Sequence, residues 1–149
     1  MADLPIPVMA GRQVYDKTPT TVFLLAHNAK RELLVIRRAK QPGYGLLGLP
    51  GGYQMRGETW QEAGARELQE ETGCCLQPSF LEFVSIRTDE YQNNLIIARS
   101  QRSVCVESER DNEALAVFFS TDIGSRNDWA HGDLYEAAVT FLSERSERS

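Results

Sequence analysis

A run of charged residues near the middle of the chain has the spacing of a metal site. Glu67, Glu70 and Glu71 stand three and four positions apart, so a helix would place their carboxylates on one face. Three like charges on one face repel each other and weaken a helix. A divalent cation with oxygen ligands turns this repulsion into attraction. The spacing therefore predicts a cation site, with a solvated acidic helix face as the alternative.

The surrounding residues predict how the acidic cluster is positioned. Thr59 and Glu62 have the spacing of a capping box, and Gly73 stands where a left-handed helix cap belongs. The Leu-Pro-Gly-Gly segment at 49–52 predicts a loop whose glycines let the backbone approach a ligand closely. Arg66 stands beside the cluster and can hold carboxylates by bidentate hydrogen bonds. Together these residues predict a loop and a helix that share one site.

The run from Gly52 to Cys74 resembles the signature of the Nudix hydrolase family, which includes the MutT-like proteins. That signature is a glycine, a glutamate, an Arg-Glu pair, two further glutamates, a glycine and an apolar residue at fixed gaps. Every fixed position is filled, and the resemblance covers the rest of the chain only in outline. The matching residues are Gly52, Glu58, Arg66, Glu67, Leu68, Glu70, Glu71, Gly73 and Cys74.

The resemblance implies a metal-dependent pyrophosphohydrolase. Such an enzyme cleaves a phosphoanhydride bond in a nucleoside diphosphate linked to another moiety. In this family the equivalents of Glu67, Glu70 and Glu71 bind Mg²⁺ or Mn²⁺, and the backbone carbonyl of the residue here numbered Gly51 often joins them. A bound ion neutralises phosphate oxygens and lowers the pKa of an attacking water.

The resemblance also implies roles for the neighbouring charges. Glu67 would be a ligand and would also help to orient or deprotonate the attacking water. Arg66 would orient Glu67 or Glu58, and Glu58 would support the ligand geometry or act as a further ligand. These three residues are the expected catalytic residues.

A further carboxylate ligand is expected from a late loop, because many family members have one shortly before an aromatic-bearing strand. Glu113 precedes the apolar run at 114–119 and fits this position best. Glu109 and Asp111 compete with it, and a solvated loop charge is the remaining alternative.

Four residues outside the signature are candidates for substrate binding. Arg37 and Arg38 end an apolar run and could meet a substrate phosphate, or else form a pair of surface charges. Tyr44 lies in a glycine-rich loop and could stack on a base. Tyr91 stands where dinucleoside polyphosphate hydrolases of the family often carry a tyrosine, although a turn tyrosine is the simpler interpretation.

The signature indicates the reaction but not the substrate. Nucleoside triphosphates and dinucleoside polyphosphates are favoured, because the proline that ADP-ribose hydrolases of the family often carry is missing near Thr88. ADP-ribose or another nucleotide sugar is the alternative substrate. A non-catalytic nucleotide-sugar sensor and an isomerase are alternative functions, and the complete set of signature carboxylates argues against both.

The remaining sequence predicts a single Nudix domain over residues 1–149 with an α/β (α+β) fold. The resemblance implies an αβα sandwich with a mixed β-sheet between helices. An irregular arm is expected at 1–17 and a polar tail at 144–149. A tight turn at 28–31 predicts that the first two strands form a hairpin. The expected strands are 20–27, 32–38, 76–88, 93–106 and 114–122, and the expected helices are 59–73 and 129–144.

Composition narrows the function classes. The chain has 149 residues and a net charge of −5, which argues against binding to a nucleic-acid polymer or an anionic membrane. Three cysteines without CxxC spacing favour reduced thiols in a cytoplasm over a zinc or disulfide framework. His27 and His131 stand in no motif and are expected to be structural. We therefore expect a cytoplasmic protein with a small nucleotide substrate, and a homodimer is a further hypothesis.

Overall fold

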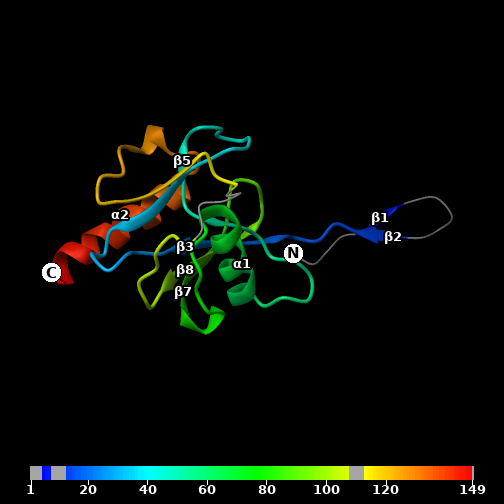
Figure 1. Ribbon diagram of the computed structural model, residues 1–149. Coiled ribbons are helices and arrows are strands. Elements are labelled where there is room, and N and C mark those ends of the chain that lie inside the picture. The colour runs from blue at the N-terminus through cyan, green and yellow to red at the C-terminus, as the bar shows by residue number, and fades with distance from the viewer. Residues whose placement is uncertain (1–4, 8–12, 108–112, 149) are drawn as a thin grey trace.

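The computed structural model describes residues 5–7, 13–107 and 113–148 (Figure 1). Side chains are described from residue 15 to 107 and from 113 to 144. The elements in chain order are β1 (Pro5–Pro7), β2 (Gln13–Tyr15), β3 (Thr20–Leu25), β4 (Leu33–Arg37), β5 (Leu47–Gly48), β6 (Gly51–Tyr53), α1 (Trp60–Thr72), η2 (Pro78–Phe80), β7 (Leu81–Thr88), β8 (Asn94–Ser100), β9 (Ala116–Ser120), η3 (Arg126–Asp128) and α2 (Gly132–Arg148).

The strands of the body form two sheets. One has the order β6-β3-β8-β7 and is mixed, because β3 runs parallel to β8 while its other neighbour, β6, is antiparallel. The second has the order β5-β4-β9 and is antiparallel. The short strands β1 and β2 pair with each other and project from the body (Figure 1). The arm, expected to be irregular or to include a short edge strand, thus contains two short paired strands.

Alternating side chains of the central strands build two cores. Val22 and Leu24 of β3 pack with Ala63 and Leu68 of α1, whereas Leu25 packs with the cluster that contains residues of α2. Strand β8 alternates in the same way along 95–98. The mixed sheet thus lies between the two helices, and the expected α+β sandwich is confirmed.

The expected hairpin between the first two body strands is wrong. The tight turn is present, because the Asn28 N–H donates to the Glu32 carbonyl at 3.1 Å and the strands share a single bridge at His27 and Leu33. Beyond this bridge, β3 and β4 enter different sheets. Eight of the eleven residues of the two strands are buried, and each strand has hydrogen-bonded neighbours from other parts of the chain on both of its edges.

The C-terminal helix also differs from its expected bounds. Trp129 is buried after the short η3 helix, and its indole N–H donates to the Ile123 carbonyl at 2.8 Å. The helix therefore begins at Gly132, and it continues through most of the expected polar tail to Arg148. None of the helices in the described part of the chain is long and apolar enough to cross a bilayer.

Candidate active site

Helix α1 begins and ends as its sequence predicts. The Thr59 Oγ1 accepts from the Glu62 N–H at 3.1 Å, and the Glu62 carboxylate accepts from the Thr59 N–H at 2.8 Å. Gly73 has a φ of 75° and its N–H donates to the Gln69 carbonyl. Gly64 faces the core, where an added Cβ would lie 3.1 Å from a Leu24 methyl. The helix is therefore fixed in rotation against the core.

Two glycines of β6 let the acidic face lie directly on the strand. An added Cβ at Gly51 would lie 2.3 Å from the Val22 carbonyl oxygen. An added Cβ at Gly52 would lie 2.6 Å from the Glu67 carboxyl carbon. Both approaches are closer than a side chain permits, so the Gly-Gly pair sets the contact between β6, its neighbour β3 and Glu67.

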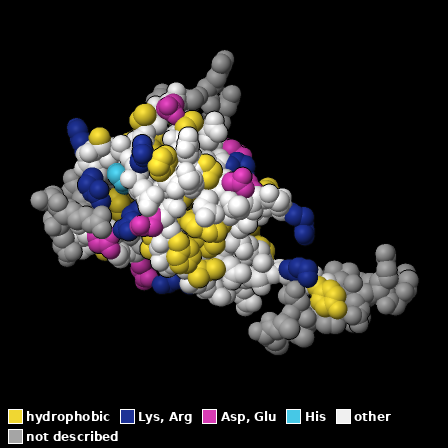
Figure 2. Space-filling model, turned by 90° about the horizontal axis from the view of Figure 1, so that it is seen from below, with side chains coloured by type: hydrophobic (Ala, Val, Ile, Leu, Met, Phe, Trp, Pro, Cys, Tyr) yellow, Lys and Arg dark blue, Asp and Glu magenta, His cyan; other side chains and the backbone are white. Residues whose placement is uncertain are grey.

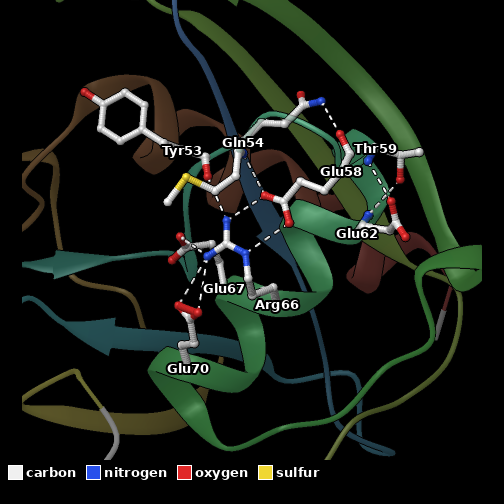
Figure 3. A network of polar contacts seen from close by, with 9 residues as sticks. Tyr53, Gln54, Glu58, Thr59, Glu62, Arg66, Glu67 and Glu70 are labelled. Atoms are coloured by element: carbon white, nitrogen blue, oxygen red, sulfur yellow. Dashed lines mark hydrogen bonds and ion pairs between the residues drawn. The ribbon is translucent and has the colours of Figure 1, made fainter.

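Arg66 is the centre of a polar network that joins α1 to the loop before it (Figure 3). Its Nε and Nη2 donate to the two Glu58 carboxylate oxygens at 3.1 and 2.7 Å. Its Nη1 donates to Glu67 at 3.0 Å and to both carboxylate oxygens of Glu70 at 3.3 Å. Its Nη2 also donates to the Tyr53 carbonyl at 2.9 Å. One guanidinium therefore orients three carboxylates.

The same network shifts the ionisation of its members. Arg66 hydrogen bonds and the Met55 N–H hold the pKa of the Glu58 carboxyl below its usual range. The hydrogen bonds to Glu58, Glu67 and Glu70 in turn raise the pKa of Arg66. Glu58 thus stays ionised and Arg66 stays cationic at neutral pH.

Arg66→Lys is expected to lower kcat/KM by about 10- to 100-fold. Lysine lacks the planar guanidinium, which donates to Glu58 and to Glu67 at the same time. Steady-state kinetics would measure this loss. Arg56→Lys is the matched control, since Arg56 is an exposed arginine ahead of the same helix, and it should retain wild-type kinetics. Equal losses in both variants would contradict the orienting role of Arg66.

Glu71 is a half-buried member of the acidic cluster and contacts β6. Its Oε2 accepts from the Gly51 N–H at 3.3 Å. Burial, followed by the nearby Glu67 and Glu113 carboxylates, raises the pKa of Glu71 to about 9. In this structure the N–H of Gly51, and not its carbonyl oxygen, contacts the Glu71 carboxylate. A carboxylate buried among others is stabilised in its ionised form by a cation.

The acidic cluster lines a cavity of about 870 Å³. The loop residue Glu113 joins the helix there, because its N–H donates to the Glu70 carbonyl at 3.2 Å. Positive charge also borders the cavity, from Arg38, Lys40 and Arg126. The volume falls in the range of small-ligand sites. The expected site residues that line it are Gly51, Arg66, Glu67, Glu70, Glu71, Glu113, Arg38 and Tyr91.

Other sequence candidates lie elsewhere. Arg37 turns away, and its Nη1 donates to the Gly45 carbonyl at 3.1 Å. Tyr44 is 57% exposed in its loop and is not part of the cavity wall. Neither side chain lines the cavity, so Arg38 is the member of the arginine pair that does, and Tyr44 is a loop tyrosine at the surface. The alternatives to Glu113 for the late carboxylate, Glu109 and Asp111, lie outside the described residues.

His131 was expected to be structural, but the structure places it in the cavity wall. Its ring meets Tyr91 edge-on with centroids 5.7 Å apart, and its Nδ1 lies 3.7 Å from a Glu90 oxygen. Burial and then the charge of Arg38 lower the pKa of His131, against the opposing effect of Glu90. No local motif marks this histidine, because the tyrosine it contacts is forty residues earlier in the chain.

This lowered pKa predicts a pH dependence of stability. Between the lower folded pKa and the unfolded value of about 6.5, the unfolded chain binds more protons than the folded protein. Stability should therefore rise with pH through this window and level off above it. His131→Gln should lose less stability than wild type between pH 7.5 and 5.5, as measured by urea unfolding. If the free energy of unfolding fell by the same amount from pH 7.5 to 5.5 in the variant and in the wild type, the prediction would be contradicted.

The described residues contain no group of three acidic, His or Cys side chains that already converges as a ligand set. In this arrangement Glu67 and Glu70 are hydrogen-bonded to Arg66, and Glu71 to Gly51. The donor chemistry nevertheless fits a hard divalent cation, since every candidate donor is an oxygen and the half-buried Glu71 carboxylate lies near two other carboxylates.

Comparison with known proteins identifies the family. A family model described as NUDIX domain matches residues 17–139. The chain belongs to the NUDIX domain family. This match confirms the resemblance seen in the signature, and it extends the family relation from that run to the whole Nudix fold of this protein.

The similar proteins are described as ADP-ribose pyrophosphatases or as NUDIX hydrolases. An ADP-ribose pyrophosphatase from Methanocaldococcus jannaschii is 48% identical over 42 residues, which are 28% of this chain and only 25% of that relative. A NUDIX hydrolase from Nitrosomonas europaea superposes with a TM-score of 0.72 at 19% identity, covering 93% of this chain and 77% of that one. The bifunctional NMN adenylyltransferase/ADP ribose pyrophosphatase from Francisella tularensis, complexed with AMP and a manganese ion, superposes with a TM-score of 0.63 at 22% identity, covering 86% and 42%. At these identities the structural likeness shows the fold.

Proposed function

We propose that this Nudix protein is a divalent-metal-dependent pyrophosphohydrolase. Its substrate would be a nucleoside diphosphate linked to another moiety. The observation that carries the proposal is one cavity whose wall includes Glu67, Glu70, Glu71 and Glu113 together with basic residues. Carboxylates alone would repel a polyphosphate, and basic residues alone would bind it without cleaving it.

The carboxylates of Glu67, Glu70, Glu71 and Glu113 would hold Mg²⁺ or Mn²⁺, and the Gly51 carbonyl would join them. When bound, the ion supplies charge neutralisation and activation of water. The manganese ion of the Francisella tularensis relative supports this choice of metal.

Residues of this chain would orient the attacking water and neutralise the substrate phosphates. Glu67 is held from one side by Arg66, which leaves its carboxylate fixed above Gly52 to orient a water and accept its proton. Glu58 holds Arg66 through two hydrogen bonds and so fixes the orienting group itself. Arg38 and Lys40 also line the cavity, and with Glu71 and Glu113 they line a small pocket, so they would neutralise substrate phosphates beside the carboxylates. Attack of water on phosphorus breaks the bond to the bridging oxygen and yields two phosphate-ended products.

Two substrate groups remain candidates. Nucleoside triphosphates and dinucleoside polyphosphates are supported by Tyr91, which lies in the cavity wall where a base could stack. ADP-ribose is supported by the local identity to the ADP-ribose pyrophosphatase. Tyr91 and His131 are close enough together to contact the same nucleotide base, and both substrate groups contain a base.

A nucleotide panel would test the proposal. Each candidate would be incubated with Mg²⁺ or Mn²⁺ in ¹⁸O-labelled water, and mass spectrometry would identify the products and the phosphorus attacked. When the metal is present, we expect ¹⁸O label in one of the two phosphate products. Without the metal, we expect no labelled product. Calorimetric binding of a nucleotide without turnover of any panel member would overturn the proposal and favour a nucleotide sensor.

A further inference from the structure

Strand β7 forms an edge of the four-stranded sheet and carries exposed apolar side chains. Its hydrogen-bonded neighbour in the described part of the chain is β8 alone. Phe83, Val84 and Ile86 are 49%, 44% and 54% exposed. Figure 2 shows a hydrophobic patch in the middle of this lower face of the molecule. An edge strand with exposed apolar residues is a template for pairing with another chain.

A β-bulge sets which side chains share a face of β7. Phe83 is opposite Ala98 and Ile86 is opposite Ile96, with the register shift between them at Val84. Ala98 and Ile96 both belong to the core under α1, so Phe83 and Ile86 lie on that face. Phe83 accordingly packs edge-on against Trp60 of α1, with centroids 6.1 Å apart.

The charged residues of β7 lie on the other face. Glu82 is opposite Arg99, and Arg87 is opposite Leu95, whose side chain belongs to the core under α2. Arg87 pairs with Asp133 of α2 at 2.7 Å, and Arg99 pairs with both Glu82 and Glu144. The strand therefore has one apolar and one charged face despite its irregular alternation.

We propose that β7 pairs antiparallel with β7 of a second copy of this chain, about a two-fold axis between Val84 and Ser85. In this register, Phe83 lies opposite Ile86 of the second copy, on the α1 face. Glu82 lies opposite Arg87 of the second copy, on the α2 face. Opposite residues in a sheet must share a face, and the bulge is what makes both of these pairs do so. The two four-stranded sheets then become one continuous sheet.

Charge complementarity is what selects a second copy as the occupant. Across the proposed contact the α2 face would carry Glu144, Arg99 and Glu82, followed by Arg87 and Asp133 of the second copy. The signs alternate along this row, and the two-fold axis repeats the row in the other direction. A slip by one residue would place Phe83 against Arg87 and lose both pairings.

The strand lacks two of the usual protections of an edge, although it carries a β-bulge and two charged residues. Its eight residues include no lysine and no proline. An interface of one strand on each side is smaller than the roughly 20–30 residues of a stable complex. We therefore expect a dimer that dissociates at about micromolar concentration rather than an obligate one.

Sedimentation velocity of the full chain across a range of concentrations tests the proposal. The wild type should shift from monomer to dimer, and Ile86→Lys should remain monomeric, because it places a charge against Phe83. Val139→Lys is the matched control, since Val139 is an equally exposed apolar residue on α2, and it should still dimerise. Circular dichroism would establish that each variant folds.

Charge reversal tests the register. Glu82→Arg and Arg87→Glu should each weaken the dimer at least tenfold, and the double variant should restore it. Within one chain Glu82 pairs with Arg99, and Arg87 pairs with Asp133 and Glu136. The double variant does not restore these internal pairs, so a restored dimer indicates pairing across the interface. A monomeric wild type at all concentrations, or a dimer indifferent to Ile86→Lys and to both reversals, would overturn the proposal.

Discussion

Glu70→Gln is expected to lower kcat by about a thousandfold, equal to roughly 4 kcal/mol of transition-state stabilisation. The proposed site uses this carboxylate as a negatively charged oxygen ligand, and an amide of the same shape removes the charge. Glu70 is on the partly exposed acidic face of α1, and its contact within the chain is with Arg66. The fold should therefore remain intact. Steady-state kinetics with Mg²⁺, together with a thermal unfolding curve, would measure both effects.

Glu62→Gln is the control for this variant. It makes the same chemical change on the same helix, and glutamine can also serve in the capping box that Glu62 forms with Thr59. Activity near that of the wild type is expected. If Glu70→Gln also kept wild-type activity with Mg²⁺, Glu70 would not be a metal ligand.

Gly51→Ala is expected to destabilise the protein by about 3 kcal/mol. The added methyl group would lie 2.3 Å from the Val22 carbonyl oxygen and 2.5 Å from the Phe23 ring. Strand β6 would have to move away from β3, and no side-chain rotation relieves contact with a backbone oxygen. The corresponding fall in Tm is roughly 10 °C, measurable by calorimetry.

Gly48→Ala separates this steric effect from the general effect of replacing glycine in a strand. The nearest atom to its added Cβ is 3.5 Å away on the flexible Arg38 side chain, an ordinary van der Waals distance. Its Tm should stay within a few degrees of the wild type, or rise slightly because the unfolded chain is restricted. A similar fall in both variants would show that the close approach at Gly51 is not the cause.

The β3–β6 contact and the acidic face are parts of one arrangement. Gly51 lets β6 lie against β3, and Gly52 then lets the Glu67 carboxylate lie over β6. Helix α1 supplies Glu67 at the correct rotation because Ala63 and Leu68, which flank Glu67 on the helix surface, are buried in the core. Loss of packing at any of these contacts would therefore reach the carboxylates through the backbone.

Local interactions explain why the helix and its acidic face could be predicted from the sequence. The capping box at Thr59, the left-handed cap at Gly73 and the spacing of the glutamates act within one or two turns of chain. Arg66 and Glu58 are eight residues apart, and their bidentate contact also follows from the signature. The fold class followed from the same run through its family resemblance.

Contacts between segments that are distant in the sequence determine the strand pairing and the choice of residues that line the cavity. The turn at Asn28 is local and was predicted correctly, but burial of β3 and β4 on both faces sends them into different sheets. His131 and Tyr91 meet in the cavity because α2 packs across the end of β7. Arg37 and Tyr44 look as suitable as Arg38 and Tyr91 in the sequence, yet only the latter two line the cavity. Side-chain direction at a strand end or in a loop depends on what packs there, and a single sequence does not contain that information.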